Sequence, residues 1–195
     1  MSLTGREHFF GAWRQLVLNT LSSSPLIDLG TPRPFQKEMS ALRGHAPMPY
    51  FCLDVTASKA VNVVGDGHDL PLRDASVGSI VCSHVLEHVA RPDRVIAEMH
   101  RVLRPGGGAY MTFLDVYPYH ASPTYPDYHR FKRDAIELLL CDWSSFTVLP
   151  GGGLGQVAVN FVPRGLGRVA QTVANRVDRW KPTTVTSAFY VGARR

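Results

Sequence analysis

The sequence predicts an α/β fold organised around a parallel β-sheet. Two short apolar runs, at residues 77–83 and 109–114, flank a segment at 91–103 whose apolar residues recur every three or four positions. Short apolar runs are typical of buried strands, and the recurrence is typical of an amphipathic helix. A strand, helix and strand in this order indicate a parallel sheet, because parallel neighbours need a helical crossover.

Length and composition predict one globular domain over residues 1–195. The chain has 45% hydrophobic and 19% charged residues, which suits a single buried core. Its three cysteines are odd in number and widely spaced, so we expect core thiols rather than disulfides or a zinc knuckle. No apolar leader or membrane-length run is visible, and we expect a cytoplasmic protein with no membrane partner.

The remaining elements follow from periodicity and from turn residues. Apolar positions in 6–21 predict a helix, and residues 1–24 are expected to form an N-terminal helical cap. Strands are expected at 25–30, 50–55, 60–66, 146–149 and 184–193, with the glycines at 106–108 ending the helix that precedes 109–114. A further helix is expected at 132–141, with Ala135, Leu138 and Leu139 facing inward, and a flexible connector at 151–155.

Three motifs in fixed order carry the most information. They are Asp-Gly-x-x-Leu-Pro from Asp66, His-Val-Leu-Glu-His from His84, and Glu-x-x-Arg-Val-Leu-Arg-Pro-Gly-Gly from Glu98. Together they closely resemble the middle of class I S-adenosylmethionine-dependent methyltransferases of the small-molecule type. The resemblance implies a Rossmann-like sheet of seven mostly parallel strands with helices on both faces. It also implies a last strand that is antiparallel, S-adenosylmethionine as cofactor, and methyl transfer to an oxygen or nitrogen of a small-molecule acceptor.

The resemblance places the cofactor along the ends of the first four strands. Asp54 ends a strand 24 residues after Gly30, where a carboxylate can accept both ribose hydroxyls, although it could instead cap the following element. Asp28 and Gly30 stand where the glycine-rich cofactor loop of the family begins. The implied contacts to adenine and to the rest of the cofactor are those of Asp66, Gly67, His68 and His84.

The cofactor loop departs from the family pattern after Gly30. Thr31-Pro32-Arg33-Pro34 follows, so the expected second glycine is absent and two prolines remove backbone donors. One hypothesis is that Arg33 compensates by pairing with the methionyl carboxylate of the cofactor. The alternative is a solvated arginine in a loop that no longer binds the cofactor.

Histidines supply the candidate catalytic groups. His84 follows the fourth strand, and the resemblance implies that it lies near the methyl group of the cofactor. The resemblance also places the proline- and aromatic-rich loop at 115–133 on the acceptor side, and a loop of this length in a compact domain is typically functional. His120 and His129 in this loop are candidate bases, since histidine titrates near neutral pH. The alternative is that Tyr128, His129 and Arg130 lock the loop to the sheet.

The motif at His84 also matches the inverted zinc-protease signature His-x-x-Glu-His. That signature needs a sustained helix and a distant carboxylate ligand, whereas Pro92 follows closely and no glutamate occurs after Glu137. We therefore expect no metal site.

Rival functions come from the charge and from the altered loop. The net charge is +5, and basic residues that include Arg164, Arg168 and Arg179 gather after residue 160. These basic residues suit a solvated surface, or alternatively the RNA-binding surface of an RNA methyltransferase. A methyltransferase-like binding protein that has lost methyl transfer, or that catalyses another reaction, is a further alternative, and a nicotinamide-dependent dehydrogenase is a third. The sequence does not predict the oligomeric state.

Overall fold

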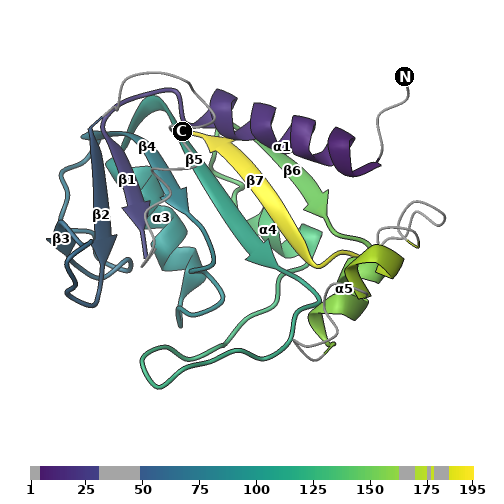
Figure 1. The fold of residues 1–195 in the computed structure, drawn as a ribbon. Helices are drawn as coiled ribbons and strands as arrows, with labels where there is room; N and C mark the ends of the chain where they lie inside the picture. The colour runs from purple at the N-terminus through teal and green to yellow at the C-terminus, as the bar shows by residue number, and fades with distance from the viewer. Residues whose placement is uncertain (1–4, 31–48, 163–169, 175–176, 178–184) are drawn as a thin grey trace.

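The computed structural model describes residues 5–30, 49–162, 170–174, 177 and 185–195, with side chains from residue 9 onward. Its centre is a seven-stranded sheet in the order β3-β2-β1-β4-β5-β7-β6 (Figure 1). The strands are β1 (Leu26–Leu29), β2 (Tyr50–Asp54), β3 (Val63–Val64), β4 (Val77–Cys82), β5 (Leu103–Leu114), β6 (Ser145–Gly151) and β7 (Ala188–Arg194). Among the described residues, the helices include α1 (Gly5–Thr20), α3 (Pro92–Val102), α4 (Arg133–Leu139) and α5 (Leu154–Asn160).

The pairing of the strands confirms the predicted fold class. β3, β2, β1, β4 and β5 run parallel, and β7 lies antiparallel between β5 and β6. The chain proceeds from β1 to β2 and β3 on one side and continues with β4 on the other side of β1. The strand order therefore reverses between β1 and β4, and open α/β sheets bind ligands at the carboxyl ends of the strands beside such a point.

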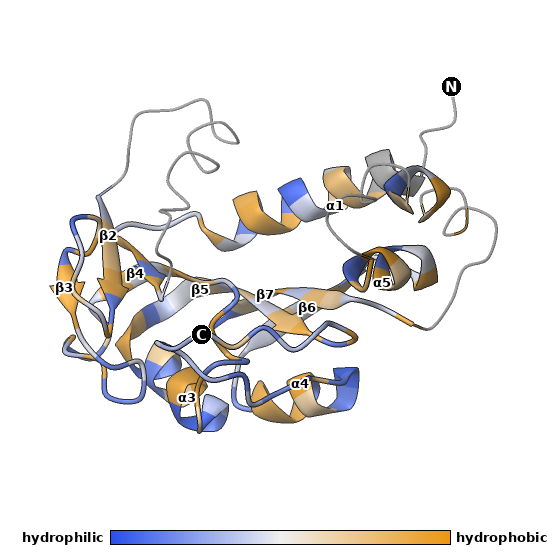
Figure 2. Cartoon of the chain, turned by 60° about the horizontal axis from the view of Figure 1, so that its bottom comes forward, coloured by the Kyte–Doolittle hydropathy of each residue, from blue (hydrophilic) through white to orange (hydrophobic). Residues whose placement is uncertain are grey.

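Helices cover both faces of the sheet (Figure 2). α3 and α4 lie on one face, where the larger core cluster includes Val95, Ile96, Met99 and Val102 of α3. α1 lies on the other face, over a smaller cluster of Val17, Leu21, Leu26, Val81 and Tyr110. The predicted N-terminal helix is thus confirmed, and its apolar stripe is buried against the sheet.

A glycine in β5 allows α1 to lie directly on the sheet. A Cβ atom built on Gly108 would be 2.1 Å from the carbonyl oxygen of Thr20, the last residue of α1. No side chain fits in that space, so the backbone of the helix and that of the strand are in contact. This contact fixes the end of α1 relative to β5.

Three local predictions were wrong. β5 begins at Leu103, directly after α3, and so includes the glycines that were expected to end the helix. The strand tolerates them because its register against β4 shifts between Val77 and Ser79, which leaves residues 104–107 outside regular pairing. In α4, Ile136 is buried, Ala135 and Leu138 are exposed, and Leu139 is half-buried. The expected flexible connector instead supplies Gly153 as the N-cap of α5.

Other outcomes concern the edges of the sheet and the cysteines. β3 has two residues instead of the expected seven. Cys52 and Cys82 are buried, as expected, but Cys141 is exposed just after α4. The basic positions 164, 168 and 179 lie outside the described residues. None of the helices within the described ranges is long and apolar enough to span a bilayer.

Candidate functional site

The carboxyl ends of β1, β2 and β4 meet at one edge of the sheet, and Gly30 makes the turn after β1. Its φ is +70°, and a Cβ atom there would lie 2.7 Å from Cγ2 of Val85 in the loop after β4. Its N–H also donates to the carbonyl of Leu53 in β2, at 2.8 Å. Only glycine satisfies both the left-handed backbone and the close approach, so the turn is rigidly held between β2 and the loop after β4.

Asp28 lies beneath this edge. Its side chain is fully buried in β1, and the Tyr50 hydroxyl donates a hydrogen bond to its Oδ2. The carboxylate therefore supports the turn from inside the sheet and does not face solvent at the edge.

Asp54 ends β2 with its carboxylate at the surface. Its Oδ1 accepts a hydrogen bond from the Thr56 N–H at 2.8 Å, which holds the side chain in a local turn. Val55, between them, is 69% exposed. In this arrangement the carboxylate can accept hydrogen bonds from the two hydroxyls of a sugar, and the exposed valine can pack against a flat ring attached to that sugar. Val55 was not predicted from the sequence, because a valine after a strand carries no signal until its exposure is known.

Asp66 and His68 are linked to each other and to α3. Asp66 Oδ1 lies 2.7 Å from His68 Nδ1, while His68 Nε2 accepts the N–H of Arg91 at 3.3 Å. The accepting Nε2 places the proton of the neutral ring on Nδ1. The His68 backbone N–H and its ring hold the pKa of Asp66 below its usual range. Gly67, between them, is half-buried against Val95, so this turn presents one carboxylate and little side-chain bulk.

His84 stands just after the end of β4 and lines a pocket. Its φ of +56° is left-handed, and its N–H donates to Thr112 Oγ1 of β5 at 2.7 Å. The side chain is 55% exposed. A pocket of about 230 Å³ is lined by Phe9, Phe10, Trp13, Ser83, His84, Tyr110, Thr112 and Tyr190.

α1 forms one wall of this pocket. Phe9 and Tyr190 meet edge to face with ring centroids 5.4 Å apart, and the Trp13 Nε1–H donates to the Tyr110 hydroxyl at 2.9 Å. Burial raises the pKa of Tyr110, so this hydroxyl stays protonated. The sequence analysis assigned Phe9 and Trp13 only to the apolar face of a helix. It could not show that β5 and β7 bring two tyrosines opposite them.

The loop at 115–133 packs on the loop between β4 and α3. The N–H groups of Tyr128 and His129 donate to the Glu87 carbonyl at 2.7 and 3.2 Å. Arg130 donates to the backbone carbonyls of Tyr117 and Pro118 at 3.1 and 2.9 Å. These bonds agree with the alternative in which the 128–130 segment locks the loop in place.

Two of the three candidate histidines approach one carboxylate. Glu87 is fully buried, and its Oε1 lies 3.6 Å from His84 Nδ1 and 3.9 Å from His120 Nε2. His129 lies elsewhere, with its ring packed against Phe131 at 5.7 Å. Position 33, named as a candidate partner of the methionyl carboxylate, lies outside the described residues.

Comparison with known proteins relates part of this chain to methyltransferases. Residues 40–111 match the sequence profile of a family described as a methyltransferase domain. Over these residues the chain is similar to methyltransferase domains. The matched stretch includes all three motifs, from Asp66, His84 and Glu98, so the resemblance read from them is confirmed.

Full-length methyltransferase structures share the fold. A S-adenosylmethionine-dependent methyltransferase from Archaeoglobus fulgidus superposes with a TM-score of 0.64 at 13% identity, covering 98% of this chain and 95% of that one. The 1,6-didemethyltoxoflavin-N1-methyltransferase of Burkholderia thailandensis, solved with its acceptor and S-adenosylhomocysteine, gives 0.58 at 16% identity, covering 96% and 78%. At these identities the likeness shows the fold.

Curated methyltransferases match over a shorter stretch. An uncharacterized methyltransferase of Mycobacterium avium is 44% identical over 59 residues, which are 30% of this chain and 23% of that protein. The chain spans less than a third of the length of the curated relatives it matches. The family profile covers Asp54, Asp66 and His84 of the site edge. The methyltransferase structures that share the fold use S-adenosylmethionine or were solved with S-adenosylhomocysteine.

Proposed function

We propose that this chain transfers a methyl group from S-adenosylmethionine to a small-molecule acceptor held in the pocket beside His84. The observation that carries the proposal is the position of His84. It ends β4 beside the edge formed by Gly30 and Asp54, and it also lines the aromatic pocket. Cofactor and acceptor can therefore bind on two sides of one residue.

The side chains at the edge fit the cofactor. When bound, S-adenosylmethionine supplies an electrophilic methyl group on a sulfonium. Asp54 would accept the ribose hydroxyls through the oxygen that Thr56 leaves available, and Val55 would lie against the adenine. Asp66 would face the rim of the adenine, and Gly30 would let the chain turn closely past the ligand.

The pocket favours an acceptor with an apolar, planar body. Its walls are mainly aromatic, and its polar groups at the His84 end are Ser83 and Thr112. Aromatic faces bind flat rings well, and a volume of about 230 Å³ suits a molecule of one or two small rings. Transfer from a sulfonium depends chiefly on position, with a base needed when the acceptor keeps its proton. His84 is the candidate base, because it is the histidine that lines the pocket.

Calorimetric titration with S-adenosylmethionine and S-adenosylhomocysteine tests the first part of the proposal, the binding of the cofactor at the edge of the sheet. We expect micromolar binding, about 8 kcal/mol, that Asp54→Ala weakens at least tenfold. Asp142→Ala, at an exposed position after α4, is the matched control and should bind like wild type. Equal binding by wild type and Asp54→Ala would contradict the assignment of Asp54.

The second part of the proposal, the binding of the acceptor, is tested by incubating the protein with S-adenosylmethionine and a panel of aromatic thiols, phenols and amines. Formation of S-adenosylhomocysteine then reports methyl transfer. Phe9→Ala should raise the acceptor KM while it leaves the cofactor Kd unchanged, because Phe9 lines only the pocket. If Phe9→Ala changed the cofactor Kd and the acceptor KM equally, the assignment of the cofactor to the sheet edge and of the acceptor to the pocket would be wrong.

A further inference from the structure

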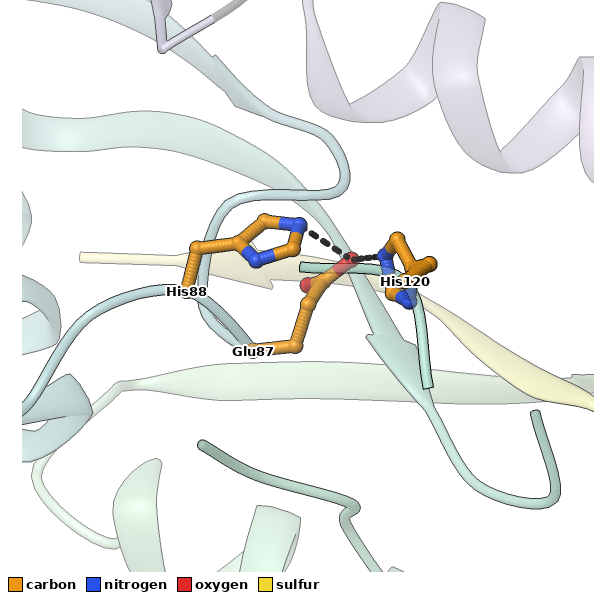
Figure 3. A group of neighbouring side chains, drawn as sticks. All are labelled: Glu87, His88 and His120. Atoms are coloured by element: carbon orange, nitrogen blue, oxygen red, sulfur yellow. Dashed lines mark ion pairs between the residues drawn. The ribbon is translucent and has the colours of Figure 1, made fainter. Parts of the chain in front are cut away.

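The loop between β4 and α3 and the loop at 115–133 bring Glu87, His88 and His120 together (Figure 3). One carboxylate oxygen and one ring nitrogen from each histidine lie within 4.8 Å of one another. Glu87 Oε1 is 3.9 Å from His88 Nε2 and 3.9 Å from His120 Nε2. Figure 3 shows the two rings approaching this oxygen from opposite sides.

Glu87 is the most unusual member of this cluster. Its side chain is fully buried, and neither carboxylate oxygen has a hydrogen-bond partner among the described residues. Removing a carboxylate from water without a partner is costly, so buried carboxylates are paired or bind cations. The contacts of 3.6–3.9 Å to the histidines are too long to be hydrogen bonds. The carboxylate therefore lacks a close cation.

The two histidine rings are held with Nε2 available. His88 Nδ1 lies 2.5 Å from the Pro126 carbonyl oxygen, and His120 Nδ1 lies 3.1 Å from that of Pro118. A carbonyl only accepts, so each Nδ1 carries a proton and each neutral ring directs its Nε2 lone pair toward Glu87. Metal-binding histidines are oriented in this way, by donating the other ring N–H to a carbonyl or carboxylate.

We propose that Glu87, His88 and His120 bind a divalent transition-metal ion, for which Zn²⁺ is the best-suited occupant. Two imidazoles and one carboxylate are a ligand set of catalytic zinc sites, in which a further position stays open. With bonds of about 2.0–2.2 Å, ligand atoms around zinc lie about 3.4 Å apart. To reach this geometry the two contacts to Glu87 would shorten by about half an ångström, and a pair of ligand atoms at the 4.8 Å limit by up to about 1.4 Å.

This site differs from the zinc signature weighed from the sequence. That signature pairs His84 and His88 on a helix, whereas the described segment between β4 and α3 contains no helix. The partner is His120, 32 residues beyond His88 in the chain. Because the site joins two loops, the metal would tie the 115–133 loop to the loop after β4. His84 Nδ1 lies 3.6 Å from the same carboxylate, and His84 also lines the pocket proposed for the acceptor.

Titration of the untagged, chelator-treated chain with Zn²⁺ tests the site without any need for activity. We expect one equivalent to bind with a micromolar or lower Kd. Replacing Zn²⁺ by Co²⁺ should produce visible d–d absorption. Loss of one outer-shell partner costs metal sites about 10–100-fold in affinity, so His120→Ala and Glu87→Gln should each weaken binding at least 100-fold. His100→Ala is the matched control. His100 lies on α3 and packs against Trp143, away from the cluster, so this variant should bind Zn²⁺ like wild type.

Thermal unfolding with and without Zn²⁺ guards against variants that only misfold. Zn²⁺ should raise the Tm of wild type and of His100→Ala, and it should leave the Tm of Glu87→Gln unchanged. Without metal, Glu87→Gln should melt no lower than wild type, because it removes an uncompensated buried charge. No Zn²⁺ binding by wild type, or equal binding by His120→Ala, would overturn the proposal. Neither result depends on methyl transfer, so failure of the metal site and of the proposed function are distinguishable.

Discussion

The Asp127 carboxylate and the Arg130 guanidinium form a two-pronged ion pair in the loop after β5, with Oδ1–Nη1 and Oδ2–Nη2 distances of 2.5 and 2.7 Å. The Asp127 side chain is fully buried, and Oδ2 also accepts the His120 N–H at 2.9 Å. Arg130 holds the pKa of Asp127 far below its usual range. The pair therefore fixes the backbone that carries His120.

Arg130→Lys should loosen this loop. A lysine ammonium cannot reproduce the planar fork, and it leaves the buried Asp127 carboxylate and the carbonyl of Pro118 with fewer donors. We expect a loss of about 2 kcal/mol in the free energy of unfolding, since hydrogen bonds to charged groups contribute about 1.5–3 kcal/mol. Urea titration measures the loss, and limited proteolysis should cut the loop faster.

Arg133→Lys is the matched control for Arg130→Lys. Arg133 pairs with Glu137 one turn along α4, at 2.8 Å, and both side chains are exposed. Exposed pairs of this kind contribute about 0.3–0.5 kcal/mol. If the two substitutions cost the same, Arg130 does not hold the loop.

Gly30→Ala should destabilise the turn after β1 by about 1–3 kcal/mol. The substitution places a side chain at φ +70° and puts its Cβ 2.7 Å from Val85 Cγ2. Chemical denaturation should show the loss with little change in the slope of the transition. Because the turn belongs to the cofactor edge, the affinity for S-adenosylhomocysteine should fall as well.

A double-mutant cycle separates the two causes of that loss. Val85→Ala removes the atoms that the new Cβ would meet, but it does not change the backbone of Gly30. The combined variant should therefore cost less than the sum of the single substitutions, with the backbone strain remaining. Simple additivity would mean that the clash with Val85 does not contribute.

One thiol should react rapidly in the native protein. Cys52 and Cys82 are buried in strands β2 and β4, and burial raises the pKa of both thiols. Cys141 is exposed, so an aromatic disulfide reagent should release one equivalent quickly and three equivalents after denaturation. Cys141→Ser should abolish the fast phase. A second fast equivalent in the native state would show that the sheet opens near Cys52 or Cys82.

Cys141 also illustrates what the sequence could predict. Its apolar neighbours suggested burial, but α4 turns Ile136 toward the core and Leu138 outward, and the chain leaves the core just after Leu140. The rotation of a seven-residue helix depends on what packs against it, which periodicity over two turns does not define. The eleven residues of α3, with a full apolar stripe, were predicted correctly.

The part of the candidate site that lies at the ends of the strands could be predicted from the sequence. Gly30, Asp54 and His84 each lie directly after an apolar run, so the edge of the sheet could be predicted before the structure was known. The pocket and the Glu87 cluster could not, because they depend on contacts between distant segments. Tyr190 reaches Phe9 only because β7 inserts beside β5, and His120 reaches Glu87 only because a loop folds back.

Glu98 and Arg101 on α3 brace the segment that carries the Asp66 motif. Arg101 donates to Glu98 through Nε and Nη2, both at 2.7 Å, and to the carbonyls of Leu70 and Leu72 at 3.0 Å. Glu98 Oε2 accepts the N–H of Leu70 at 2.8 Å. The hydrogen bonds from Arg101 lower the pKa of Glu98 below its usual range.

The stability that Glu98 contributes should depend on pH with a defined sign. Since its pKa is lower in the folded than in the unfolded state, the contribution is complete above the unfolded value of about 4.3 and is lost as the pH falls through the folded value. Glu98→Gln should cost about 1–2 kcal/mol at pH 7, and the gap to wild type should close as the pH falls through the lowered pKa of Glu98 in the folded state. Urea unfolding across this range measures the gap. Glu137→Gln, in an exposed pair, should show a small and nearly constant difference, and a constant gap for Glu98→Gln would mean that its charge does not brace the segment.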